Sequence, residues 1–187
     1  MRRWLAVPAF CALSACVPEY SGEPVGTYEV TGALEENACG SQAVDARDPV
    51  MFRVEVRREG DRAWWRRPDA PLVEGTVDAD GVYSFRSQAR RTVIEPDPDA
   101  GDPGCVVEQA ETVEARLLGT DADAGTPEAG MGDAAAPPTM LEGTHVIDLS
   151  PVAGSDCTAA LAVSGGPFRA LPCNVDYTLA GSPTDPL

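Results

Sequence analysis

The sequence predicts an all-β protein, a single antiparallel β-barrel or β-sandwich of about eight strands. Three observations support this fold class. Apolar and polar residues alternate with period two in many short segments. Glycine, proline and aspartate recur between those segments, and these residues favour turns. Amphipathic periodicity of the helical kind is hard to find, so we do not expect helices to form the core.

The clearest expected strand runs from Val50 to Arg57. Its apolar residues Phe52, Val54 and Val56 alternate with charged residues, so one face of this strand should lie in the core. We expect the other strands at residues 26–34, 62–67, 72–78, 82–87, 90–94, 106–118, 144–149, 159–163 and 174–179.

The connections between some of these strands can also be predicted. Asp80-Gly81 supplies the positive φ of a hairpin turn, so segments 72–78 and 82–87 should form a hairpin. Segment 106–118 is longer and less regular, and the sequence leaves open whether it is a bulged strand or a helix.

The chain is expected to divide into a leader, a tether and one domain. We expect residues 1–15 to be a signal peptide, residues 16–24 a short tether and residues 25–183 the β-domain. Residues 119–140 are acidic, rich in alanine, glycine and proline, and nearly free of large apolar side chains. Because such a segment cannot bury enough surface to offset its ordering entropy, we expect a disordered insertion there.

The first sixteen residues have the features of an export signal. Arg2 and Arg3 precede an apolar run that is too short to span a bilayer, which needs about 20 apolar residues. The run ends in Leu13-Ser14-Ala15-Cys16, which resembles the lipobox of bacterial lipoproteins. The resemblance implies cleavage before Cys16, a lipid on its sulfur and, usually, a further acyl chain such as palmitate, which together anchor the protein to a membrane. The alternative is an ordinary cleaved signal with Cys16 as a disulfide partner.

The residue after the lipobox cysteine bears on which membrane holds the protein. In Gram-negative lipoproteins, aspartate at that position retains the protein in the inner membrane. Val17 stands there in this chain, so the resemblance implies an outer-membrane location.

The tripeptide Gly26-Thr27-Tyr28 opens the first expected strand. It is similar to the Gly-x-Trp opening of lipocalin-type barrels, with tyrosine where that family has tryptophan. The resemblance implies a barrel that is lipocalin-like in outline.

Four cysteines remain once Cys11 leaves with the signal and Cys16 is lipidated. They are Cys39, Cys105, Cys157 and Cys173. In an exported protein this even number predicts two disulfides, with three possible connectivities. Because the last two cysteines are close in sequence and flank a turn, the sequence favours Cys157–Cys173 and, by elimination, Cys39–Cys105. A Cys39–Cys173 bond, joining the first and last strands of a closed barrel, would contradict this pairing.

The charge of the chain is strongly acidic and unevenly placed. The formal net charge is −16, and the chain has no lysine. Residues 53–91 hold nine arginines against seven acids, whereas residues 92–187 hold two arginines against sixteen acids. Like-charge repulsion makes nucleic acid an unexpected partner. The simplest explanation of this acidity is that it keeps the protein soluble. The alternative is that it attracts a cationic partner, such as a basic enzyme or peptide.

Two adjacent tryptophans among arginines form the most unusual candidate binding surface. Trp64 and Trp65 should point to opposite faces of a strand. The outward indole, beside Arg62, Arg66 and Arg67, would then be free to stack on a sugar, a lipid headgroup or a partner protein. The alternative is that arginine stems cover the ring and the segment is structural.

Catalytic motifs are missing from the sequence. His145 is the only histidine, and it is in phase with Ile147 and Leu149, so we expect a neutral, hydrogen-bonded histidine on the core face rather than a catalytic base. The chain lacks the Gly-x-Ser-x-Gly, His-Glu-x-x-His, Cys-x-x-Cys and phosphate-loop patterns. No catalytic residue and no cofactor is therefore predicted.

The acidic loop from Asp97 to Asp102 is partly similar to a calcium-binding loop. Glycine and aspartate fall at the wrong positions for the EF-hand pattern. We expect a solvated turn there and no metal site.

The sequence thus favours a membrane-anchored, extracytoplasmic binding module that performs no chemistry and binds a small ligand or a partner protein. An inhibitor of a cationic secreted enzyme, a hydrolase that uses carboxylates and a structural envelope protein remain as alternatives.

Overall fold

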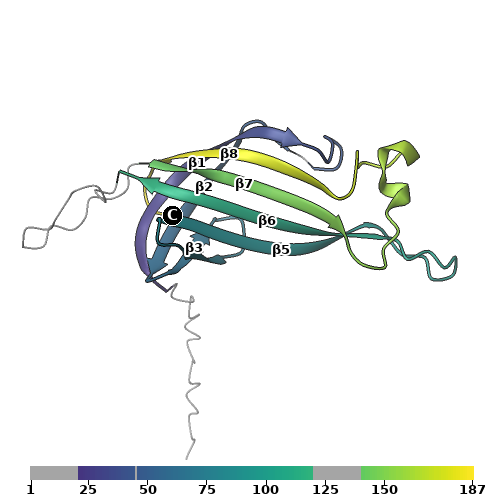
Figure 1. The fold of residues 1–187 in the computed structure, drawn as a ribbon, viewed down its shortest axis with the longest axis horizontal. Helices are drawn as coiled ribbons and strands as arrows, with labels where there is room; N and C mark the ends of the chain where they lie inside the picture. The colour runs from purple at the N-terminus through teal and green to yellow at the C-terminus, as the bar shows by residue number, and fades with distance from the viewer. Residues whose placement is uncertain (1–20, 45, 120–139) are drawn as a thin grey trace, which may run out of the picture.

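The structure is a computed structural model that describes residues 21–44, 46–119 and 140–187. It confirms the all-β fold class as a closed antiparallel barrel of eight strands, in which each strand pairs with the next and the last pairs with the first (Figure 1). The strands are β1 (Glu23–Asn37), β2 (Val50–Glu59), β3 (Arg62–Arg66), β4 (Val73–Val77), β5 (Val82–Ile94), β6 (Cys105–Leu118), β7 (Met140–Pro151) and β8 (Cys173–Pro183). Two short 3-10 helices, η1 (Thr158–Ala160) and η2 (Ala162–Ser164), lie between β7 and β8.

Several expected features fall outside the described residues. These are the signal peptide 1–15, the lipidated Cys16 with most of the tether, and residues 120–139 of the insertion. At the boundaries, β1 begins at Glu23 and β7 begins at Met140, so each strand takes residues that we expected in the tether or the insertion. Within the described residues, no helix is long and apolar enough to cross a membrane.

Some strand boundaries differ from expectation. The two segments 82–87 and 90–94 form one continuous strand, β5. Segment 106–118 is a strand and not a helix, because β6 pairs along its whole length with β5 and β7. The hairpin expected around Asp80-Gly81 is present, and Gly81 has the positive φ of 75° that the turn needs.

The expected strand at 159–163 is wrong, since η1 and η2 occupy this segment. Asp156 Oδ1 accepts a hydrogen bond from the Thr158 amide at 2.9 Å, which turns the chain just before η1. Gly165 then ends η2 in the left-handed conformation, with φ 85°. Ala160 and Phe168 are buried in the core cluster, so the segment is a packed connection and not a ninth strand.

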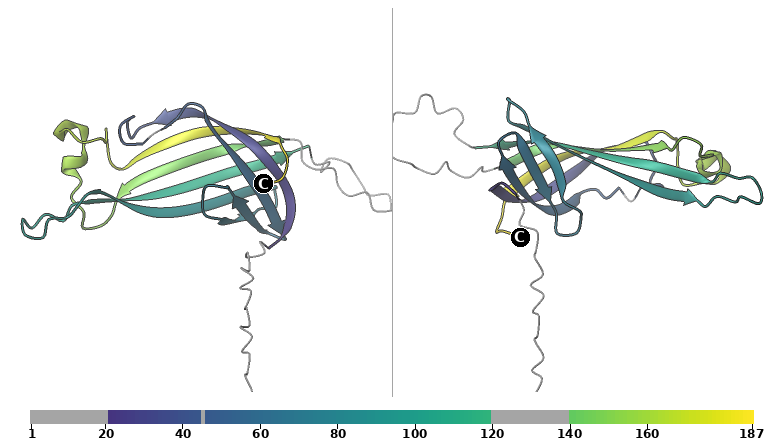
Figure 2. Two further views of the ribbon diagram at one scale, coloured as in Figure 1. Left: turned by 180° about the vertical axis from the view of Figure 1, so that it is seen from behind. Right: turned by 90° about the horizontal axis from the view of Figure 1, so that it is seen from below.

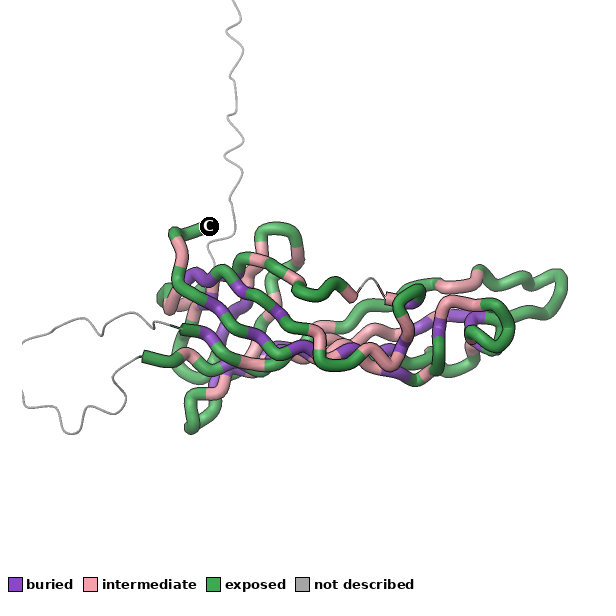
Figure 3. The backbone as a smooth tube through the Cα atoms, turned by 90° about the horizontal axis from the view of Figure 1, so that it is seen from above, coloured by how far each residue is buried: buried purple, intermediate pink, exposed green. Residues whose placement is uncertain are grey.

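The predicted alternation of buried and exposed residues is present along the strands, as the colouring of Figure 3 shows. Val54 and Val56 of β2 are buried, while their charged neighbours lie at the surface or only partly covered. Tyr28 of β1 is fully buried, and burial raises the pKa of its hydroxyl to about 12. Its ring lies against Gly26, where a Cβ atom would come within 2.7 Å of the hydroxyl oxygen. The Gly-x-Tyr tripeptide therefore has a packing role at the start of the barrel.

The barrel is closed along only part of its length. Strand β4 pairs with β5 only from Tyr83 to Phe85, although β5 continues to Ile94. On the other side, β2 pairs with β1 only as far as Gly32, although β1 continues to Asn37. The long strands thus extend beyond the short strands β2, β3 and β4 as a curved sheet that is open on one side (Figures 1 and 2).

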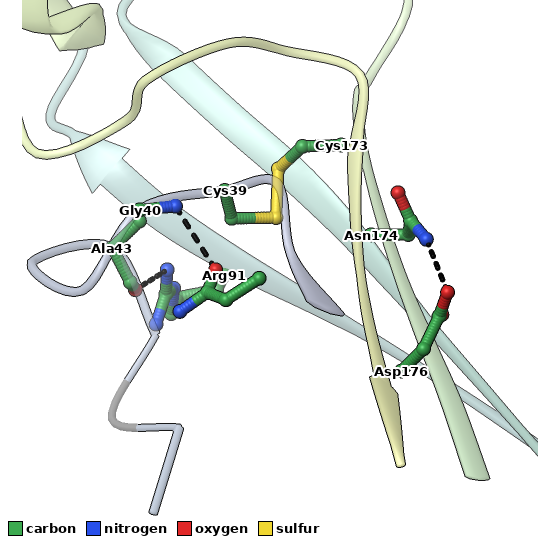
Figure 4. The surroundings of a disulfide bond; sticks show 8 residues. Cys39, Gly40, Ala43, Arg91, Cys173, Asn174 and Asp176 are labelled. Atoms are coloured by element: carbon green, nitrogen blue, oxygen red, sulfur yellow. Dashed lines mark hydrogen bonds between the residues drawn. A yellow bond between two sulfur atoms is a disulfide. The ribbon is translucent and has the colours of Figure 1, made fainter. Parts of the chain in front are cut away.

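The expected disulfide pairing is wrong. The structure has Cys39–Cys173, with a sequence separation of 134, and Cys105–Cys157, with a separation of 52. Proximity in sequence favoured Cys157–Cys173, but β8 begins at Cys173 beside the end of β1, which places that cysteine next to Cys39 (Figure 4). Both bonds lie at the open end of the barrel, where strand pairing is least complete.

This connectivity can be tested directly. Peptide mapping without reduction should recover a Cys39–Cys173 peptide and a Cys105–Cys157 peptide. Because each bond closes a long loop, replacing either pair by serine should lower the free energy of unfolding by about 4–5 kcal/mol, measured by denaturant titration. Recovery of a Cys157–Cys173 peptide from folded protein would contradict the structure.

Candidate functional site

A pocket of about 640 Å³ opens where β4 ceases to cover β5. Its walls come from β2, β3, β5, β6 and β7, from the start of β4 and from the β3–β4 connection, residues 67–72. The pocket is therefore a consequence of the unequal strand lengths. It lies at the open end of the barrel interior and is reached from the side.

The floor of the pocket is aromatic. Trp65 packs against Phe85 with ring centroids 5.2 Å apart and against Phe52 at 6.2 Å in an edge-on arrangement. Trp65 is only 4% exposed, since it pairs with Val56 on β2 and Val73 on β4. Phe85 is 2% exposed, so these aromatic contacts form a rigid apolar wall.

His145 occupies the inner face at the edge of the pocket, as expected from the alternation in β7. It lies in one cross-strand row with Val113 and Tyr177, and its ring stacks on Tyr177 at 6.1 Å. The side chain is buried. Its Nε2 lies 3.3 Å from Glu111 Oε2 but has no well-aligned hydrogen-bond partner among the described residues, so the contact is chiefly electrostatic.

Glu111 is the inward-facing acidic group of the pocket, and Glu74, paired with Arg62, also borders it. Its Oε1 accepts a hydrogen bond from Gln109 Nε2 at 2.6 Å, and both side chains come from the inner face of β6. The contact with His145 is the main cause that lowers the pKa of the Glu111 carboxyl, against the opposing effect of burial, with smaller contributions from Gln109 and from the charge of Arg67. At neutral pH the pocket therefore holds a carboxylate.

Arg67 lies at the rim. Its guanidinium stands 4.8 Å from the centroid of the Phe52 ring, and its Nη2 is 3.2 Å from Asp69 Oδ2. Arg67 thus lines the pocket while its charge is already engaged by Asp69.

The hypothesis of an exposed tryptophan surface is wrong. Trp64 and Trp65 do point to opposite sides of β3, but Trp64 is only 5% exposed. Gly22 covers its indole: a Cβ atom on that glycine would come within 2.7 Å of Trp64 Cζ3. The guanidinium of Arg62 stands 5.3 Å from the ring centroid. The outward indole is thus buried by the chain entering the barrel and by an arginine.

The remaining arginines of the predicted surface are paired. Arg62 forms an ion pair with Glu74, and Arg66 forms one with Glu55 at 2.9 Å. The structure therefore separates the predicted set into two groups. Trp65 and Arg67 reach the pocket, whereas Trp64, Arg62 and Arg66 lie on the outer wall of the barrel.

The sequence analysis missed Glu111 and Gln109. A signal for them is present in β6, where both residues stand in phase with the buried residues Val107, Val113 and Ala115. Two adjacent polar positions on an otherwise apolar strand face indicate that this part of the face meets water or a ligand.

Neither a metal site among the described residues nor a similarity to known proteins indicates what the pocket binds. Among the described residues, no three His, Cys, Asp or Glu side chains gather as a metal site would require. In the acidic loop, Asp97 Oδ1 accepts hydrogen bonds from the amides of Asp99 and Ala100, as in a solvated turn. Comparison of the chain with protein-family models, curated proteins and solved structures gives no match.

The ionisation of Glu111 predicts how acid affects stability. A carboxyl whose pKa is lowered on folding stabilises the fold above its ordinary value of 4.5, and this stabilisation is lost as the pH falls through the lower, folded-state pKa. Glu111→Gln should therefore flatten the decline of the melting temperature below pH 4.5. Glu108→Gln, on the outer face of the same strand, is the matched control and should keep the decline. An unchanged acid profile in Glu111→Gln would contradict the assigned role.

Proposed function

We propose that the protein is a non-catalytic binding module, anchored to the bacterial envelope through a lipid on Cys16, and that it takes a small molecule in the pocket at the open end of the barrel. The observation that carries the proposal is the pocket itself. It combines an aromatic floor, Trp65 with Phe85 and Phe52, with one inward-facing carboxylate, Glu111. Small-molecule sites typically have this character, with apolar walls and a few placed polar groups in about 300–1,000 Å³.

The burial of the tryptophan pair favours a small ligand over a partner protein. The protein-binding alternative depended on an outward indole, and both indoles are at most 5% exposed. The pocket, in contrast, brings together side chains from several strands around one concave space.

Non-catalytic action is supported by the state of the single histidine. His145 is 8% exposed, and its Nε2 is buried against Glu111. A general base must be within hydrogen-bond reach of the substrate proton, and this ring is enclosed by its own neighbours instead.

Export and anchoring are supported by two features. The structure forms two disulfides, which persist in oxidising compartments, and the sequence Leu13-Ser14-Ala15-Cys16 resembles a lipobox. The order of the strands adds an orientation. Glu23 begins β1 opposite Arg58, near the β2–β3 turn, whereas the β3–β4 connection that borders the pocket lies at the other end of these strands. The described chain thus enters the barrel at the end opposite the β3–β4 connection.

Pocket binding can be measured with a neutral naphthylamine dye that fluoresces in apolar surroundings. We expect saturable binding of one dye per protein. Ser87→Trp, which adds bulk inside the pocket from β5, should weaken it at least about ten-fold. Ser84→Trp, on the outer face of the same strand, is the control and should leave it unchanged. Absence of saturable binding, or equal loss in both variants, would refute the pocket as the site.

Anchoring requires a separate test in cells. The protein should fractionate with membranes and incorporate a labelled fatty acid, because several acyl chains bind stably to a bilayer. Cys16→Ser should abolish both properties, while Cys11→Ser should preserve them. Unchanged membrane fractionation of Cys16→Ser would exclude the lipid anchor.

A further inference from the structure

We propose that the pocket takes an organic cation, a protonated amine carried on an apolar body, with the ammonium group at the Glu111 carboxylate and the body against the apolar lining of the pocket. This inference rests on the proposed function, since it names the ligand class of the same pocket.

The first argument is the unused capacity of Glu111. A carboxylate offers about four acceptor positions. In the described structure Gln109 donates a hydrogen bond to one oxygen, and His145 Nε2 lies 3.3 Å from the other. The Glu111 side chain keeps 33% of its surface exposed and lines the pocket, so its carboxylate is open to a donor brought by a ligand.

The second argument is the state of the nearby cations. Arg67 at the rim is engaged by Asp69 and by the Phe52 ring. Arg86 also borders the pocket, but it is exposed and alternates with the inward-facing Phe85 and Ser87 of β5. Among the described residues neither guanidinium forms an ion pair with Glu111, so apart from His145 Nε2 at 3.3 Å its carboxylate has no basic side chain within ion-pair distance and can receive a cation from a ligand.

The third argument is the apolar lining of the pocket. Phe52, Leu72 and Ala89 line it together with Glu111, while the buried rings of Trp65 and Phe85 pack against each other in its wall. An amine attached to an apolar body is complementary to the carboxylate and to this lining.

The field of the whole protein acts in the same direction. With a formal net charge of −16, the chain raises the local concentration of cations and repels anions. The arginines of β3 weaken this effect little, because Arg62 and Arg66 are paired with Glu74 and Glu55.

The test compares three probes that share one indole ring. Calorimetric titration of the intact protein at low salt with tryptamine, tryptophol and indole-3-propionate presents a cation, a neutral alcohol and an anion on nearly the same body. We expect tryptamine to bind about ten-fold more tightly than tryptophol, as a charge-assisted hydrogen bond predicts, and indole-3-propionate to bind most weakly. Added salt should weaken the binding of tryptamine and leave the binding of tryptophol unchanged.

Glu111→Gln identifies the group responsible. Tryptamine affinity should fall about ten-fold in this variant, to that of tryptophol, whose retained affinity shows that the pocket is intact. Glu108→Gln, on the outer face of β6, should leave the affinities for tryptamine and tryptophol unchanged. Three results would overturn the ligand class and still leave a small-molecule site. They are equal affinities for the three probes, tighter binding of the anion, and tryptamine binding that Glu111→Gln leaves unchanged. If the naphthylamine dye binds and no indole does, the ligand class is wrong; if neither binds, the proposed function fails as well. If Glu111→Gln does not fold, the probe order and the salt dependence in the unmutated protein decide between these outcomes.

Discussion

The structure depends on one mismatch in backbone hydrogen bonding. Strand β5 has 13 residues and pairs with β6 over nearly all of them, but its other neighbour, β4, has only five residues. From Arg86 to Ile94, β5 has no strand beside it on that edge within the described residues. A sheet that closes at one end and opens at the other must stabilise its open end by other means.

Three kinds of contact stabilise the open end. The disulfides Cys39–Cys173 and Cys105–Cys157 tie the β1–β2 and β7–β8 connections to the first residues of β8 and β6. Arg91 donates from the inner side of β5 to the Ala43 carbonyl at 3.2 Å (Figure 4), which ties the β1–β2 connection to the sheet. The exposed stretch of β5 also carries Arg86 and Arg90, and charge on an open edge opposes pairing with another copy. The same gap that needs these contacts forms the pocket, so stability and binding have one structural origin.

The parts of this fold that the sequence predicts are the local ones. Period-two alternation predicts strands such as β2, because each side chain's face depends only on its neighbours in sequence. The disulfide pairing was mispredicted because it depends on which strands meet across the closed barrel, and Cys39 meets Cys173 only after β8 returns to β1. Residues 159–163 were mistaken for a strand because short apolar runs without turn residues look alike in a strand and in a packed connection.

The candidate site was only partly predictable for the same reason. Alternation places Trp64 and Trp65 on opposite faces, but it does not reveal that Gly22 covers the outer indole. Glu111 was missed because a polar residue on a core face indicates a pocket only once β4 is seen to begin at Val73 and to leave the rest of β5 without a neighbour on that edge.

The two adjacent indoles provide the most direct test of the central claim that a ligand enters the gap beside β4. Trp65 lines the pocket, whereas Trp64 lies on the outer wall against Gly22. In a two-dimensional ¹H–¹⁵N spectrum, assigned with Trp64→Phe and Trp65→Phe, each indole Nε1–H gives its own resonance. Titration with tryptamine should shift the Trp65 resonance progressively to saturation and leave the Trp64 resonance in place. Saturable binding that shifts Trp64 alone, or neither resonance, would contradict the account.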